Sequence, residues 1–268
     1  MAQIEFVDGR SLDERAAKAI RQGWLYSHMY TRRSEFVSSR KARIFCGTYN
    51  VNAKKIDDGT ELQAWLLPSL SGLQAAPAPD VYALGFQEIV DLNTMNVALD
   101  GSKTIARSQF WTEKVGECLA NRPDGVKYSL VESKHLVGLL LCVYVKSSLL
   151  QAGEVRDVRL AATAVGVMGM GNKGGVAIRL HLYDTSLCFV CSHLAAHREN
   201  VEGRNADYRA IVEKTLFSAD TNHSISSMTT GWVDKPLWGY HRTSSQNLRI
   251  LDHDCVFWIG DLNYRIDA

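Results

Sequence analysis

Polar residues able to bind metal or to move protons follow several apolar runs in this 268-residue chain. Each run ends in a residue of that kind: RIFCGTY in Asn50, VYALGFQ in Glu88, LCFVCS in His193, and CVFWIG in Asp261, with Asn263 two residues further on. Strands that pack in layers bring their ends together along one rim, where residues distant in sequence converge. We therefore expect these side chains to form the wall of one site. If the last strand continues through Asn263, Asp261 and Asn263 face the same way.

The residue types suit metal-assisted phosphoryl chemistry. A hard cation such as Mg²⁺ takes oxygen ligands, and Asn50 and Glu88 offer them while leaving positions for water and phosphate. Asp261 is the candidate base that activates water, with Asn263 holding the base or the nucleophile in register. His193 is the candidate donor to a phosphoryl oxygen. Because each residue alone is more often a turn former, a helix cap or a structural histidine, the prediction depends on their coincidence.

A glycine-rich segment, GMGNKGG at 169–175, is the second signal. Its glycines allow successive N–H groups to point into one concavity, and Lys173 adds a compact positive charge, so phosphate is the expected ligand. The segment also reads as a hairpin between two strands, and both interpretations hold together if the hairpin tip lies at the site.

Two metal-like patterns carry less weight. His193 and His197 form H-x-x-x-H, but Leu194 stands where a zinc H-E-x-x-H motif has its acid, which disfavours zinc. Cys188 and Cys191 form C-x-x-C within an apolar run, where residues three apart on a strand point to opposite faces. We expect reduced core thiols.

The composition of the chain argues against several classes of protein. The chain is 46% hydrophobic with a net charge of +1 and a pI near 7.7, which predicts a globular protein without a basic field for nucleic acid. Its longest apolar stretch, residues 136–145, is about half of what a membrane helix needs. The N-terminus lacks the apolar region of a secretion signal, so we expect a cytoplasmic protein.

The chain is expected to have two parts. Residues 1–42 form a helical lead-in and linker, with a helix from Ser11 that packs on the following domain. The basic residues after it have two interpretations, a contact with anionic lipid and a solvated linker, and we prefer the linker. Residues 43–268 alternate apolar strands with helices after Thr60, after Ser108 and around Tyr208, which predicts an α/β sandwich. Residues 218–247 are polar and without a period, and are interpreted as a long loop.

These blocks closely resemble the catalytic domain of the inositol polyphosphate 5-phosphatases, Mg²⁺-dependent enzymes of the exonuclease/endonuclease/phosphatase superfamily related to deoxyribonuclease I. The matching blocks are FCGTYNVN (45–52), PDVYALGFQEIV (79–90), LVGLLLCVYV (136–145), GMGNKGGVAIRL (169–180), CSHLAAH (191–197), RNADY (204–208) and DHDCVFWIGDLNYRI (252–266). The preceding segment MYTRRSEFVSSRKARIF resembles the lead-in of the type II group, whose members act on membrane phosphoinositides.

The resemblance implies a DNase I-like two-layer β-sandwich flanked by helices. It implies Mg²⁺-dependent removal of the 5-phosphate from phosphoinositides such as phosphatidylinositol 4,5-bisphosphate or from soluble inositol polyphosphates, at the cytoplasmic surface of a membrane and without a nucleic-acid partner. The implied roles are Mg²⁺ binding by Asn50 and Glu88, contact with the scissile phosphate by His193, activation of water by Asp261 with Asn263, and substrate binding by Asn172, Lys173 and His197.

One departure from the family pattern limits the prediction. Two later blocks of the family, Pro-x-Trp-x-Asp-Arg-Ile/Val-Leu and Ser-Asp-His, do not occur in this sequence. The expectation is a domain truncated at its C-terminus, with an incomplete sandwich. An alternative is therefore a non-catalytic fragment that binds phosphate and leaves a sheet edge unpaired. A nuclease on the same scaffold is a third reading, which the near-neutral charge disfavours.

Overall fold

The structure is a computed structural model that describes residues 10–55, 60–67, 77–92, 101–165, 173–218 and 247–265. The chain divides into two compact units, residues 1–41 and 42–268. Each unit is described by itself.

The smaller unit contains one long helix, α1 (Arg10–Thr31), followed by a 3-10 turn, η1 (Arg33–Glu35). The turn is held by a bidentate pair, in which Arg32 Nη2 lies 2.6 Å from Glu35 Oε2. The predicted helix is present, and its packing on the following domain stays a prediction. No described helix in either unit has both the length and the apolar content needed to cross a bilayer.

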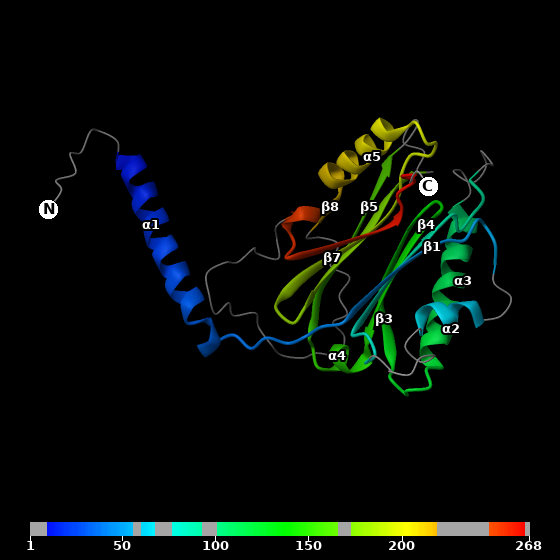
Figure 1. Cartoon of the computed structure of the whole chain (residues 1–268), viewed down its shortest axis with the longest axis horizontal. Coiled ribbons are helices and arrows are strands. Elements are labelled where there is room, and N and C mark those ends of the chain that lie inside the picture. The colour runs from blue at the N-terminus through cyan, green and yellow to red at the C-terminus, as the bar shows by residue number, and fades with distance from the viewer. Residues whose placement is uncertain are drawn as a thin grey trace. The chain divides into compact units, whose positions relative to one another are not determined.

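The larger unit is built on two four-stranded sheets (Figure 1). The first has the strand order β1 (Ile44–Asn50), β2 (Val81–Gln87), β4 (Leu139–Lys146), β3 (Tyr128–Leu136). The second has the order β10 (Cys255–Asp261), β7 (Thr185–His193), β6 (Lys173–Leu182), β5 (Val155–Val165). A short ribbon pairs β8 (Leu216–Phe217) with β9 (Leu248–Arg249).

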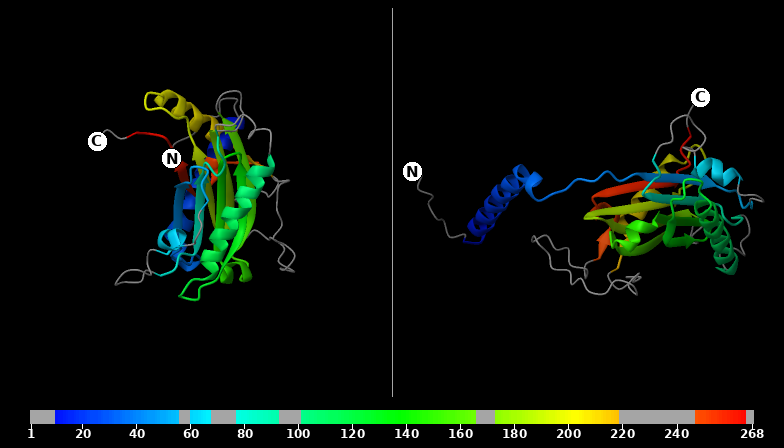
Figure 2. Two further views of the ribbon diagram at one scale, coloured as in Figure 1. Left: turned by 90° about the vertical axis from the view of Figure 1, so that its right-hand side faces the viewer. Right: turned by 90° about the horizontal axis from the view of Figure 1, so that it is seen from below.

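Helices flank the two sheets (Figure 2). The first sheet carries α2 (Thr60–Leu66) and α3 (Gly101–Ala120), and the second carries α5 (Val201–Lys214). Short turns complete the unit: α4 (Ser147–Gln151) and η5 (Ile250–Asp252). This is the predicted DNase I-like architecture of a two-layer β-sandwich with helices outside.

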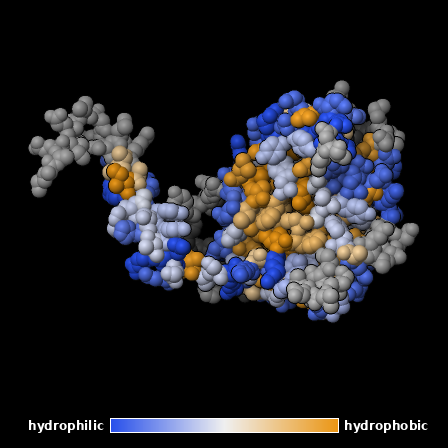
Figure 3. Space-filling model, in the orientation of Figure 1, coloured by the Kyte–Doolittle hydropathy of each residue, from blue (hydrophilic) through white to orange (hydrophobic). Residues whose placement is uncertain are grey.

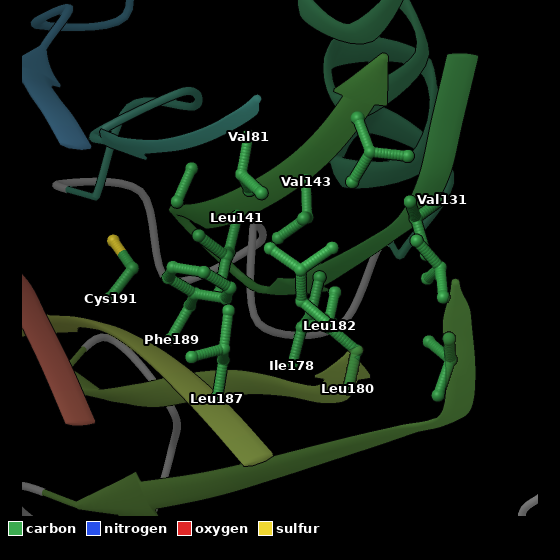
Figure 4. Packing of buried hydrophobic residues seen from close by; sticks show 14 of the residues in the cluster. Val81, Val131, Leu141, Val143, Ile178, Leu180, Leu182, Leu187, Phe189 and Cys191 are labelled. Atoms are coloured by element: carbon green, nitrogen blue, oxygen red, sulfur yellow. The ribbon is translucent and has the colours of Figure 1, made fainter. Parts of the chain in front are cut away.

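Side chains that alternate along the strands form three apolar layers. Val81 and Ala83 point into the layer between the sheets, which Figure 4 shows, whereas Tyr82 and Leu84 point to the helices α2 and α3. The third layer lies between the second sheet and α5. Strands buried on both faces read as continuous apolar runs, which explains why these strands were recognisable in the sequence.

The two thiols of the C-x-x-C pattern lie in different layers, as predicted. Cys188 faces the α5 side of the second sheet and Cys191 faces the inter-sheet core. Burial raises the pKa of each thiol to about 12, so both are protonated core residues.

Several element predictions differ from the structure. The strand β3 was not predicted, because its half-buried sequence YSLVESKHL mixes polar residues into the apolar ones. The helix expected after Ser108 begins earlier, at Gly101. The helix expected around Tyr208 ends at Lys214, and Leu216 after it is exposed in β8. The predicted loop at 218–247 lies outside the described residues except for its two end residues.

Strand directions bring the polar strand ends to one edge of the sandwich. β1 runs parallel to β2, and β10 runs parallel to β7, so each pair has its carboxyl ends on the same side. The close approach of β10 to β7 requires Gly260, which has φ +128°, because a Cβ there would lie 2.0 Å from the carbonyl oxygen of Ser192. This tight pairing places the next residue, Asp261, opposite His193.

β1 and β10 are the outer strands of their sheets, and both lie on the face seen in Figure 1. Within the described ranges, neither has a paired strand on its outer side. Apolar residues gather on the same face of the larger unit (Figure 3). Both outer strands are only partly buried, whereas β2 is buried throughout.

A buried ion cluster holds the far end of β5 and β6. The Asp157 carboxylate accepts a hydrogen bond from Arg159 Nε at 2.7 Å and another from the Arg179 guanidinium, and both arginine side chains are 1% exposed. Burial alone would raise the pKa of Asp157, but the hydrogen bonds and charges of the two arginines outweigh it and hold that pKa below its usual range.

We predict that Asp157→Asn lowers the free energy of unfolding by about 3 kcal/mol at pH 7, because it leaves two buried guanidinium groups without their carboxylate. Since the folded pKa is depressed, this stabilisation is present above the unfolded pKa of about 3.9 and is lost as the pH falls through the folded value. Urea unfolding at pH 7 and pH 3 measures both effects.

The matched control for this prediction is Asp184→Asn, because the Asp184 side chain is fully exposed in its pair with Arg156 and such pairs contribute little. Equal losses of stability for the two variants at pH 7 would contradict the prediction.

Candidate functional site

Two carboxylates from different sheets meet at the rim. Glu88 directly follows β2, and Asp261 ends β10. The amide of Asn50, at the end of β1, lies between them: its Nδ2 donates to Glu88 Oε1 at 3.0 Å and to Asp261 Oδ2 at 3.1 Å. The Asn50 Oδ1 accepts from the main-chain N–H of Asn52 at 3.0 Å. The predicted convergence of these three residues is therefore present.

His193 completes the group together with Lys173. His193 Nε2 lies 3.6 Å from Asp261 Oδ2 and 4.0 Å from Glu88 Oε1. Lys173 Nζ lies 2.6 Å from the same Nε2. An ammonium group only donates, so the Nε2 of His193 accepts in this arrangement.

The charge states follow from burial. Burial and the neighbouring Lys173 ammonium lower the pKa of His193 to about 4. Burial also lowers the pKa of Lys173, while the carboxylates of Asp261, Glu88 and Asp207 act in the opposite direction. His193 is therefore neutral near pH 7, and in the hydrogen bond between the two side chains Lys173 is the donor and His193 is the acceptor.

Asn263 does not point to the same side as Asp261, which was expected if the last strand continued through both residues. β10 ends at Asp261, and Asn263 has φ +55°, so the two side chains do not share a strand face. The main-chain N–H of Asn263 donates to Asp261 Oδ1 at 3.0 Å, whereas its side-chain Nδ2 donates to the carbonyl oxygen of Leu194. Asn263 thus orients Asp261 through its backbone.

Residues with left-handed backbone conformations gather at this rim. Non-glycine residues rarely adopt positive φ, and each such residue costs about 1–3 kcal/mol, so a cluster of them indicates a functional constraint. Those around the site are Asn52, Ala53, Glu88, His197 and Asn263. The strain lies at the positions that aim the carboxylates and shape the walls.

A cleft of about 1030 Å³ opens beside the carboxylates. Glu88 and Lys173 line it, and so do His197 and Asn200 from the loop that follows β7. His197 therefore lies at the cleft, outside the Glu88, His193 and Asp261 group, and its role in substrate binding stays a prediction. The segment from 194 to 200 is not helical, so His193 and His197 do not form a helical zinc pair.

The structure does not describe Asn172, so its predicted role lies outside the described residues. Sequence reasoning assigned no role to Asp207 and Arg204, although both belong to the block RNADY. Asp207 lines the cleft, and burial raises the pKa of its carboxyl group. Arg204 is 1% exposed directly behind the loop at 194–200. In the sequence, the only indication of a role for these two residues was that they form a polar group on a helix with weak apolar periodicity.

The donor set fits a divalent cation. Ligand atoms of Glu88, His193 and Asp261 lie within 4.8 Å of one another. Among the described residues of this group, the carboxylates of Glu88 and Asp261 are accompanied by one ammonium group, that of Lys173, so negative charge is in excess. A hard cation prefers such oxygen ligands. In the present arrangement Asn50 turns its amide nitrogen, and not its oxygen, to the carboxylates.

Comparisons with known proteins agree with this geometry. Residues 47–268 match the endonuclease/exonuclease/phosphatase family 2. The chain is 38% identical over 242 residues to the type II inositol 1,4,5-trisphosphate 5-phosphatase of Mus musculus, covering 90% of this chain and 20% of that protein. It is 34% identical over 236 residues to the polyphosphatidylinositol phosphatase INP53 of Saccharomyces cerevisiae, covering 87% of this chain and 18% of that protein.

A solved structure shares the fold. The inositol polyphosphate 5-phosphatase domain of SPSynaptojanin, in complex with inositol (1,4)-bisphosphate and a calcium ion, matches with a TM-score of 0.68 and 31% identity. The match covers 92% of this chain and 60% of that chain, so this chain spans only part of each of these relatives. The fold, the rim of polar strand ends and the matched residues identify the chain as a member of the endonuclease/exonuclease/phosphatase family 2, similar to the inositol polyphosphate 5-phosphatases.

Proposed function

We propose that this protein hydrolyses the 5-phosphate of phosphoinositides such as phosphatidylinositol 4,5-bisphosphate, with Mg²⁺ as its cofactor. The observation that carries the proposal is the meeting of Glu88 and Asp261 with Asn50, His193 and Lys173 at one rim of the sandwich, where Glu88 and Lys173 also line a cleft. The names of the similar proteins, which refer to inositol phosphates and polyphosphatidylinositol, support this substrate class.

The residues proposed to hold Mg²⁺ are Asn50 and Glu88. Bound there, the ion supplies Lewis-acid polarisation of the phosphoryl group. Rotation of the Asn50 amide exchanges its nitrogen for its oxygen, which gives a hard ligand beside the Glu88 carboxylate. The similar solved domain is in complex with a calcium ion, which supports a divalent cation as cofactor.

The proposed hydrolysis uses the chain's own groups at three positions. Asp261 is held through both carboxylate oxygens, by the N–H of Asn263 and by Asn50 Nδ2. It accepts a proton from the attacking water while the water oxygen forms a bond to phosphorus. The bond between phosphorus and the inositol oxygen breaks. Lys173 stabilises the phosphoryl oxygens with its positive charge, and the leaving oxygen takes a proton from water. His193 orients Lys173 through Nε2.

We propose further that the protein acts at the cytoplasmic surface of membranes, as a peripheral protein in lipid signalling. Residues 1–41 contain eight Lys and Arg against five Asp and Glu, and α1 exposes Trp24 and Tyr26. Basic and amphipathic aromatic side chains favour anionic lipid surfaces, which supports this placement.

We predict that Glu88→Gln weakens Mg²⁺ binding at least about tenfold, because it removes one negative charge from the ligand set. Isothermal titration of the full chain with Mg²⁺ measures this. The control is Glu213→Gln, which makes the same change at an exposed position on α5. Wild-type Mg²⁺ affinity in Glu88→Gln would rule out this residue as a ligand.

We predict that the full chain releases inorganic phosphate from phosphatidylinositol 4,5-bisphosphate in vesicles when Mg²⁺ is present. Asp261→Asn should lower the rate at least about 100-fold, because the base is lost while the hydrogen-bonding shape is kept. Glu213→Gln serves again as the control. Failure of the wild-type chain to release phosphate from any 5-phosphorylated inositol would refute the proposed activity.

A second candidate function is phosphate binding without turnover. The outer strands β1 and β10 have no further paired strand in the described ranges, and this observation favours a scaffold that binds without completing catalysis. Binding of inositol phosphates with no phosphate release would support it. Nicking of plasmid DNA in Mg²⁺ would instead favour a nuclease.

A further inference from the structure

The loop between β7 and α5, residues 194–200, is a wall of the cleft that has no regular structure of its own. Its backbone groups therefore need partners outside a helix or a sheet. On one side, the N–H of Leu194 donates to the carbonyl oxygen of Asp261, and the carbonyl oxygen of Leu194 accepts from Asn263 Nδ2. These bonds join the loop to the end of β10.

On its other side, the loop is held by two side chains from α5. The Arg204 guanidinium donates to the carbonyl oxygens of Ala195 at 3.4 Å, His197 at 2.5 Å and Arg198 at 2.9 Å. The Asp207 carboxylate accepts from the N–H of Ala195 at 2.9 Å. Because these two side chains are three residues apart on α5, they face the loop together.

The Arg204 side chain is an unusual support for a loop. All of the oxygens that accept from its guanidinium in the described part of the chain are main-chain carbonyls, and the ring of Tyr264 lies 4.9 Å from its Cζ. Its Nε is buried without a hydrogen-bond partner among the described residues. A buried cation is costly, so this arrangement persists only where packing and neighbouring dipoles compensate it.

The clamp also sets the polarity of the cleft wall. Arg204 is 1% exposed and does not line the cleft, whereas Ala195 and His197 do. The carbonyl oxygens of Ala195 and His197, with the negative ends of their peptide dipoles, are thus turned to a buried guanidinium that is not part of the cleft lining. This orientation suits a wall that faces a polyanion. The same bonds hold His197 at φ +77°, a conformation that costs energy without such support.

We propose that Arg204 and Asp207 are positioning residues that hold the loop at 194–200 as the anion-facing wall of the cleft. Neither touches the reacting atoms in this role. The loop they hold is bonded to Asp261 and Asn263, so the clamp also supports the end of β10. The assignment of the cleft to phosphorylated inositols rests on the proposed function, whereas the support of the loop does not.

The test of loop support uses hydrogen exchange by mass spectrometry on the full chain. In Arg204→Met, amides of residues 194–200 should exchange at least about tenfold faster, while amides of the β6 core at 176–178 keep their protection. Arg204→Lys should lie in between, because one ammonium cannot bond three carbonyls in the fork geometry of arginine. Arg209→Met, at an exposed position on the same helix, is the matched control and should change nothing.

Two outcomes of that experiment would overturn the proposal: unchanged loop exchange in both Arg204 variants, or loop and core amides accelerating together, which marks general destabilisation. If Arg204→Met does not fold, Arg204→Lys decides between these outcomes.

A binding experiment tests the role of the wall with inositol 1,4-bisphosphate and Ca²⁺ as probes. Arg204→Lys should weaken inositol 1,4-bisphosphate binding several-fold, up to about tenfold, and leave Ca²⁺ binding alone unchanged. Equal inositol phosphate affinity in a variant with a loosened loop would refute the anion-facing role. If the wild-type chain binds no inositol phosphate, the proposed function fails, and the exchange experiment still decides whether Arg204 positions the loop.

Discussion

The structure depends on holding two like charges next to each other at the open rim of a β-sandwich. Glu88 and Asp261 come from different sheets, and repulsion between their carboxylates would separate flexible side chains. The Asn50 amide donates to both, and Lys173 lies nearby on His193. These groups compensate the negative charge only in part. The remaining negative excess is what makes this rim suitable for a cation.

The apolar core keeps these groups in place. Because the inter-sheet layer is close-packed, with Val143, Ile178 and Phe189 fully buried, the distance between the two sheets does not adjust freely (Figure 4). The parallel pairs β1–β2 and β7–β10 then set which strand ends meet. Packing far from the site therefore fixes the separation of Glu88 and Asp261, and the strained backbone at the rim adds the final orientation.

Support for the cleft comes from outside the strands as well. The loop after β7 has few backbone partners of its own, and α5 provides them through Arg204 and Asp207. The helix α5 thus has two roles. Its apolar residues cover the outer face of the second sheet, and its Arg204 and Asp207 side chains hold a wall of the cleft. This double use explains why a helix with weak apolar periodicity occupies this position.

The sequence by itself determined the fold class, most of the strands and the set of residues at the rim, because both the buried strands β2 and β7 and the partly buried strands β1 and β10 appear as apolar runs with a polar residue at the end. Only the tertiary structure decided how those residues are turned. Positive φ at Glu88 and Asn263 redirects side chains that simple alternation would place differently, and the short contact of Lys173 with His193 assigns the proton to the lysine. Arg204 and β3 escaped prediction for the same reason: their roles arise from partners far away in the chain, and no local pattern of apolar residues records them.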